Sequence, residues 1–429
     1  MSFISIHLGK KAWLKIALAN LVIVAILGFL LRSKIVFTIP FLDFKNTLHA
    51  HSHYAFGGWV TLSLIVLMVY EILPKSLSSK PIYQVLFGSI LLNAVGMLIS
   101  FTWGGYNFYS ILFSTLFIFT TYVFAFVFIR HVVKACVAGP VRDLGISAAI
   151  YLVLSSVGPF TLAYLLASGS NNAFLYKDAI YTYLHLQYSG FFALAIFALL
   201  FNRLDNRFSM KTSKLAKVFS TLLNLSVLPS LFLSYLWHYP GTIYQVIAVS
   251  GSILITLSLV ALIAFALAAR NVFLQLNMIT FKLLMIAGCA FMLKSLFQTL
   301  PIFHSIGALV FSNRPVIIAF LHLVLLGFVS IYILSHYTLA EVLKPGNATR
   351  RALAGFAGAV IVNEVVLFSQ GADIMLMHNR VLYPYLLWLA SLLLLAGAIL
   401  LLRCVLHNKV SVTNSSEYKK QFQSFSNFK

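Results

Sequence analysis

Apolar runs long enough to cross a bilayer follow one another along nearly the whole chain. A membrane-spanning helix needs about 20 predominantly apolar residues. Such runs occupy roughly residues 13–32, 46–73, 82–103, 107–130, 144–168, 178–202, 214–237, 241–269, 277–300, 315–340, 351–372 and 382–403. Polar residues gather in the short segments between them. The pattern predicts an all-α, polytopic membrane protein with twelve transmembrane helices.

The composition agrees with this prediction. Of the 429 residues, 61% are hydrophobic and 9% are charged, which is more apolar than a soluble core can absorb. The formal net charge of +21 comes from Lys and Arg spread over short loops, so we expect membrane lipid and no nucleic acid as a partner. The cysteines, Cys136, Cys289 and Cys404, form no CxxC pair, so neither a disulfide framework nor a thiolate zinc site is indicated.

The basic residues divide unevenly between the two sides of the predicted bundle. Clusters around Arg130, Arg203 and Arg350 lie on one side, whereas the loops on the other side hold scattered ones. The positive-inside rule makes the first side cytoplasmic. We therefore expect a protein of the cell (inner) membrane with both termini in the cytoplasm. Residues 1–408 are predicted to form a single transmembrane domain, and residues 409–429, which are polar and lack periodicity, a disordered cytoplasmic tail.

One short pattern occurs once in each third of the chain. It consists of a histidine followed, five residues later, by a glycine and an aromatic residue: His53-x4-Gly58-Trp59, His185-x4-Gly190-Phe191 and His322-x4-Gly327-Phe328. The three histidines fall on the second, sixth and tenth predicted helices, so the twelve helices divide into three pseudo-symmetric groups of four. All three lie about 10 Å below the same membrane face, at about 1.5 Å per helical residue. Because a buried imidazole is costly and is a common ligand of metals and haem iron, the repeat indicates a haem or metal.

The first copy lies within a denser histidine cluster. Residues 48–59 read LHAHSHYAFGGW and contain His49, His51 and His53. On a helix, His49 and His53 share one face and His51 points to the other. The sequence leaves open which of the three is a ligand. For any single histidine, a hydrogen bond to a neighbouring helix is the structural alternative.

The segments HSHYAFGGW (51–59) and AFLHLVLLGF (319–328), with the helix count, resemble subunit I of the haem-copper oxidase superfamily, which includes nitric oxide reductases. The resemblance covers most of the chain. It implies that His53 and His322 are axial ligands of a low-spin haem b, with His51 as the alternative on the second helix. It also implies that His185 matches a copper ligand and that Arg380 holds a haem propionate. A cytochrome c, a cupredoxin or a quinol would be the electron donor.

Several positions depart from that family. Phe320 stands two residues before His322, where the family has a second haem ligand. The seventh helix carries Asn224 and Ser226 where a histidine pair for copper is expected. The low-spin haem half therefore remains, without a complete oxygen-reducing centre. A non-standard second metal site, in which His49 joins histidines at the ends of other helices (His238, His304, His378), stays open.

These features predict a membrane b-type haem protein that serves electron transfer or redox sensing. Two alternatives remain: an oxidoreductase that reduces oxygen or nitric oxide with a non-standard second metal site, and a haem-free transporter or scaffold. Glu364, near the middle of the eleventh helix, is a candidate for proton relay or quinol binding, with a structural carboxyl as the other interpretation. Lys294 on the ninth helix is expected either to pair with Glu364 or to reach outward.

Overall fold

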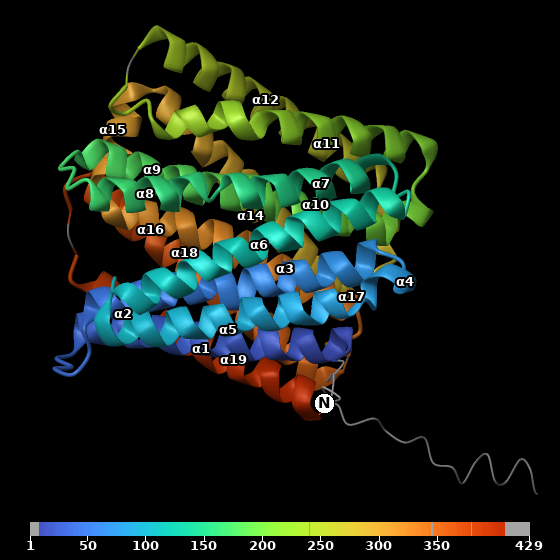
Figure 1. Cartoon of the computed structure of the whole chain (residues 1–429), viewed down its shortest axis with the longest axis horizontal. Helices are drawn as coiled ribbons and strands as arrows, with labels where there is room; N and C mark the ends of the chain where they lie inside the picture. The colour runs from blue at the N-terminus through green and yellow to red at the C-terminus, as the bar shows by residue number, and fades with distance from the viewer. Residues whose placement is uncertain (1–7, 240, 345, 379, 408–429) are drawn as a thin grey trace, which may run out of the picture.

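A computed structural model describes residues 8–239, 241–344, 346–378 and 380–407. Within these ranges, twelve helices are long and apolar enough to cross a membrane. They run across the view of Figure 1, from α12 (Thr242–Ala268) at the top to α19 (Leu382–His407) at the bottom. The all-α, twelve-helix prediction is confirmed, and the chain is an integral membrane protein. The predicted tail, 409–429, lies outside the described residues.

We number the membrane spans in chain order. Spans 1, 3, 4, 8, 11 and 12 are single helices: α1 (Lys10–Val36), α5 (Pro81–Gly104), α6 (Phe108–Lys134), α12, α18 (Asn347–Met375) and α19. Span 5 joins α7 (Gly139–Leu154) and α8 (Val157–Ala167). Spans 7 and 9 are α11 (Met210–Leu231) and α14 (Met278–Thr299), each ending in a 3-10 turn. The short helices α4 (Lys75–Ser78), α13 (Arg270–Leu274) and α15 (His304–Ser312) lie between spans.

Several spans extend beyond the apolar run that predicted them, because polar residues cap their ends. Span 6 begins at Ala173, where the Asn172 side chain accepts hydrogen bonds from two backbone N–H groups. Asn107 and Ser110 form a reciprocal capping box at the start of span 4, where the predicted run and the helix begin within one residue of each other. Side-chain caps satisfy backbone donors that have no intrahelical partner. Hydropathy locates the apolar centre of a helix but not these polar end turns.

Spans 2, 6 and 10 form the centre of the bundle. The buried share of their apolar stretches is 83%, 94% and 56%, against 22–50% for the other nine spans of the described chain. Span 2 packs between spans 1 and 3, span 6 between 5 and 7, and span 10 between 9 and 11. The remaining spans surround them, and Trp13 of span 1 closes this ring by donating to Gln84 of span 3. The three pseudo-symmetric groups remain a prediction, which this packing order supports.

The repeated motif coincides with an irregularity in the backbone of each central span. The α-helix widens into a π-helix over Ala55–Thr61 in span 2, Leu186–Phe192 in span 6 and Leu323–Ser330 in span 10. Each segment starts within two residues of its matched histidine and contains the glycine and aromatic residue of the motif. π-Helical turns are rare and occur frequently at functional sites. The sequence repeat is therefore also a structural repeat.

The α-helical parts of the central spans flank these π-helical segments. Span 2 contains α2 (Phe44–Tyr54), α3 (Leu62–Leu67) and a second π-helical segment, Met68–Ile72. Span 6 contains α9 (Ala173–His185) and α10 (Ala193–Leu204), and span 10 contains α16 (Arg314–His322) and α17 (Ile331–Leu339). We call the side of the bundle where span 1 begins the N side and the opposite side the far side. The three matched histidines precede their π-helical segments and lie toward the far side.

Close packing explains two further features of the motif. A Cβ on Gly190 would stand 2.6 Å from the Cβ of Tyr151 in span 5, so this glycine lets the two helices approach. Trp59 of span 2 donates its indole N–H to the Ser330 hydroxyl of span 10 at 2.9 Å. The central spans are thus tied to one another as well as to the ring.

Candidate functional site

His51 projects from span 2 toward span 1. Its Nδ1 lies 3.1 Å from the backbone oxygen of Val24. Its Cε1 lies 3.3 Å from where a Cβ on Gly28 would stand, so the missing side chain of that glycine makes room for the imidazole. His51 is therefore seated between spans 1 and 2 and not in a loop.

His322 ends the α-helical part of span 10 on the same side of the bundle. Its Nδ1 lies 2.9 Å from the Ile318 backbone oxygen one turn earlier. His51 and Arg32 both lie within electrostatic range of this imidazole. Arg32 is also a neighbour of His51. Side chains from spans 1, 2 and 10 thus converge, and we call His51, His322 and Arg32 the paired-histidine site.

The hydrogen bonds of the paired-histidine site select one ring nitrogen for ligation. In both His51 and His322, Nδ1 faces a backbone carbonyl, which accepts from an N–H. A proton on Nδ1 leaves the Nε2 lone pair free, and second-shell bonds of this kind fix the tautomer of metal-ligating histidines. Both imidazoles are partly covered by the surrounding chain. These two nitrogens are the ones that would hold the iron of a haem, as the resemblance predicts for a histidine pair on spans 2 and 10.

Arg32 is the last residue of the first predicted apolar run. The helix continues beyond that run to Val36, and the Arg32 side chain is partly covered by the surrounding chain. Among the described residues, no ion pair joins Arg32 to a carboxylate. An unpaired, partly covered guanidinium suits a carboxylate of a bound group. The apolar Ile35 and Val36 after Arg32 are the sequence signal for the longer helix.

His53 and His49 face span 3, on the opposite side of span 2 from His51. His53 stacks on Phe101 with ring centroids 4.4 Å apart, and its Nε2 lies 3.5 Å from the Tyr106 hydroxyl. The His49 ring lies 4.7 Å from the Tyr106 ring. Burial raises the pKa of Tyr106, which keeps this phenol neutral and able to donate to His53. The predicted division of the three histidines between two faces is present, and His51 is the one near His322. His53 is partly covered, like His51, and its role as a ligand stays a prediction. His51, and not His53, is among the groups that lie near His322.

His185 occupies the position that the resemblance assigned to copper. It is fully buried, and its Nε2 lies 2.8 Å from the Val227 backbone oxygen of span 7 and 3.4 Å from the Ser230 hydroxyl. In the described ranges, no group of three or more His, Cys, Asp or Glu side chains could hold a metal ion. His185 thus bonds spans 6 and 7 through Nε2, while its buried Nδ1 has no partner among the described residues, and its role as a copper ligand stays a prediction.

The histidines at the far-side helix ends form no group of three or more that could hold a metal ion in the described ranges. His238 pairs with Asp178 at 3.0 Å, and His304 lies 3.3 Å from the Leu236 backbone oxygen. His49 lies instead beside Tyr106, at the end of span 3. The arrangement gives no support to a second metal site made from these residues.

Arg380 is engaged within the chain. Its Nε lies 2.9 Å from the carboxylate of Asp373, which also accepts from the Tyr383 hydroxyl at 2.6 Å. The side chain of Arg380 is mostly exposed. Its predicted role at a haem propionate stays a prediction.

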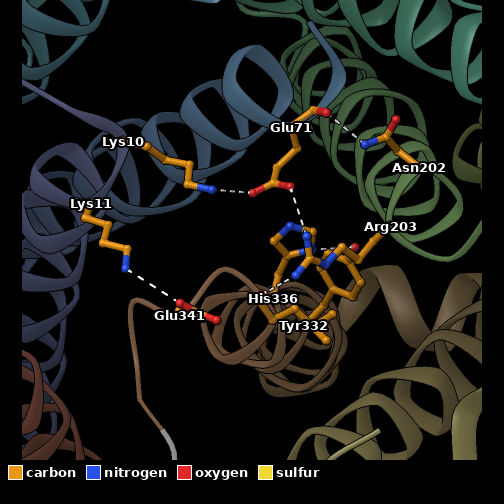
Figure 2. Close-up of polar contacts among 9 residues, drawn as sticks. Lys10, Lys11, Glu71, Asn202, Arg203, Tyr332, His336 and Glu341 are labelled. Carbon is orange, nitrogen blue, oxygen red and sulfur yellow. Dashed lines mark hydrogen bonds and ion pairs between the residues drawn. The ribbon is translucent and has the colours of Figure 1, made fainter. Parts of the chain in front are cut away.

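Figure 2 shows a second polar cluster, at the N side, that sequence analysis did not single out. The Glu71 carboxylate accepts from Lys10 at 2.7 Å and lies 3.9 Å from Arg203. His336 is fully buried within electrostatic range of it, and its Nδ1 lies 3.2 Å from the Tyr332 hydroxyl. We call Glu71, Lys10, Arg203 and His336 the carboxylate cluster. It joins spans 1, 2, 6 and 10.

The two charged residues predicted inside spans 9 and 11 do not form an ion pair with each other. Glu364 accepts from the neighbouring Asn363 amide at 3.1 Å, and its second carboxyl oxygen is buried with no partner in the described chain. Lys294 donates instead to Ser189 of span 6 at 2.8 Å. Outward reach of Lys294 is also wrong, because the side chain lies inside the bundle.

No protein-family model matches this chain, and no curated protein sequence matches it. The functional assignment therefore depends on its own residues and their arrangement.

Proposed function

We propose that this protein is a membrane b-type haem protein in which His51 and His322 hold a low-spin haem for electron transfer or redox sensing. One observation carries the proposal: two imidazoles from neighbouring spans converge beside an unpaired arginine, each with Nδ1 held by a backbone carbonyl. This arrangement presents two Nε2 atoms as ligands. A bound haem would supply reversible one-electron chemistry.

The chain's own residues would perform three tasks at this site. Val24 and Ile318 orient the ligand rings through their carbonyls. Arg32 offers a positive charge to a propionate. The central spans, which are tied by Trp59 and Ser330, keep the two ligand-bearing helices at a fixed separation.

The site lies toward the far side, which the positive-inside rule makes the outer side of the cell membrane. A cytochrome c, a cupredoxin or a quinol would then be the electron donor. An oxygen- or nitric oxide-reducing enzyme is less well supported, since His185 is bonded to span 7 and not to further ligands. The test below distinguishes the haem protein from the second alternative, a haem-free transporter or scaffold.

The test is a pyridine haemochrome assay with a reduced-minus-oxidised spectrum of the purified protein. We expect haem b and a bis-histidine α-band, which His51→Ala and His322→Ala abolish. The matched control is His53→Ala, two residues from His51 on the same helix, which should retain the band because His53 faces Phe101 and Tyr106.

Two outcomes would count against parts of the proposal. Wild-type protein that is produced with ample haem and still lacks it would refute the haem assignment and favour a transporter or scaffold. A band that survives His51→Ala and disappears in His53→Ala would keep the haem but overturn the ligand assignment.

A further inference from the structure

A small polar cavity lies at the junction of spans 6, 7, 8 and 9, apart from the paired-histidine site. It has room for about one particle of the size of a water molecule. Its polar lining comprises Lys294 and Gln298 together with five serines, Ser189, Ser226, Ser230, Ser258 and Ser295. Polar side chains from four different helices therefore surround one enclosed volume.

The cavity contains more hydrogen-bond donors than the protein satisfies. Lys294, only 4% exposed, donates to the Ser189 hydroxyl at 2.8 Å, and an ammonium group has two further N–H donors. One turn later on the same helix, Gln298 accepts at 3.4 Å through Oε1 from Ser189, while its Nε2 is buried without a partner in the described part of the chain. Two nitrogens on one face of span 9 thus carry N–H groups that have no acceptor in the described part of the chain.

The charge of Lys294 also lacks a counter-ion. Within the described ranges no carboxylate forms an ion pair with it, and the whole sequence has only nine Asp and Glu residues. Its Nζ lies 5.3 Å from the Tyr188 ring centroid and 5.8 Å from that of Phe291, and these contacts compensate the charge only in part. A buried ammonium is costly unless it is paired.

We propose that this cavity binds a small monovalent inorganic anion, of which chloride is the probe. The Lys294 ammonium and the Gln298 amide would donate to the anion, and the adjacent Ser295 hydroxyl can add a third donor. A water molecule fits the volume but leaves the positive charge uncompensated. A chloride ion satisfies both the donors and the charge, and because it is larger than water its entry requires the flexible side chains of the lining to shift outward. The site is independent of the haem proposed above.

The experiment compares thermal unfolding of the detergent-purified protein in sodium gluconate and in increasing sodium chloride at constant ionic strength. We expect the wild-type midpoint to rise by a few degrees and to saturate, as for a ligand that binds the folded state. Lys294→Met should abolish this dependence. Lys282→Met, which removes an exposed lysine of the same span, should retain it. Lys294→Met should also keep the haem α-band, which separates this proposal from the haem assignment.

A second measurement covers the case in which Lys294→Met does not fold. Crystals of the wild-type protein grown in bromide should give an anomalous peak beside Lys294 and Gln298. Equal midpoints in gluconate and chloride, together with no bromide peak, would overturn the proposal and indicate a neutral lysine beside water.

Discussion

Glu71 and Lys294 are both charged residues enclosed by the helical bundle, but their surroundings are opposite. The Glu71 carboxylate is surrounded by groups from three other spans: the cationic Lys10 and Arg203 and the imidazole of His336. Lys294 meets hydroxyls, an amide and aromatic rings, and no carboxylate among the described residues pairs with it. The chain therefore supplies its own counter-charges for Glu71 near the N side. For Lys294 it supplies none in the described ranges, which is why we propose a bound anion there.

The largest expected effect comes from removing the shared carboxylate. Glu71→Gln leaves Lys10, Arg203 and His336 facing one another, and we expect a loss of about 2–3 kcal/mol in the free energy of unfolding. This loss is smaller than the loss expected for a fully buried ion pair, because the Lys10 side chain remains partly exposed. Denaturant unfolding in detergent measures the loss. Asp143→Asn, which breaks the exposed Arg142 pair, is the control and should cost less than about 1 kcal/mol.

The second prediction is a gain, not a loss, in the free energy of unfolding. In gluconate, where no small anion is present, Lys294→Met removes an uncompensated charge and should stabilise the protein by about 1 kcal/mol. The same unfolding experiment in chloride should narrow or reverse that gain, because only the wild type gains a ligand. If Lys294→Met destabilises the protein in gluconate as strongly as Glu71→Gln does, the protein itself compensates the charge of Lys294. That result would contradict the difference drawn between the two residues.

The smallest effect distinguishes two neighbouring lysines. Lys10 donates to Glu71 at 2.7 Å, whereas Lys11 lies 4.0 Å from the exposed Glu341. We expect Lys10→Met to cost about 1 kcal/mol and Lys11→Met to be close to neutral, as is usual for exposed pairs. Thermal unfolding of the two variants under identical conditions tests this. Equal losses would mean that the carboxylate cluster does not depend on its closest partner.

The sequence predicted the twelve spans well because about 20 consecutive apolar residues have few alternatives to crossing a bilayer. It also predicted that His51 and His53 face different sides of their helix, since that follows from helical periodicity. It could not tell which side meets span 10. The direction a helix face points is set by packing against neighbours far away in sequence, here span 1 through Val24 and Gly28.

The polar clusters were harder to predict for a different reason. Glu71 and His336 lie near the ends of apolar runs, where hydropathy suggests an interface, yet folding brings them together from spans 2 and 10 inside the bundle. The serines around Lys294 are spread over four spans and barely alter the hydropathy of any of them. Sites of this kind become visible only when the helices are assembled.

Each π-helical segment changes the direction in which side chains point at one end of a central span relative to the other end. A π-turn holds more residues than an α-turn, so the backbone after it is rotated relative to an uninterrupted α-helix, in which each residue advances by about 100°. In span 10 the segment Leu323–Ser330 separates His322 from His336. A one-residue deletion at Leu326 that restored a regular helix would leave His322 in place and turn His336 away from Glu71. The number of residues in this one π-helical segment therefore sets the rotation between His322 and His336 about the helix axis, and so lets one span serve both the paired-histidine site and the carboxylate cluster.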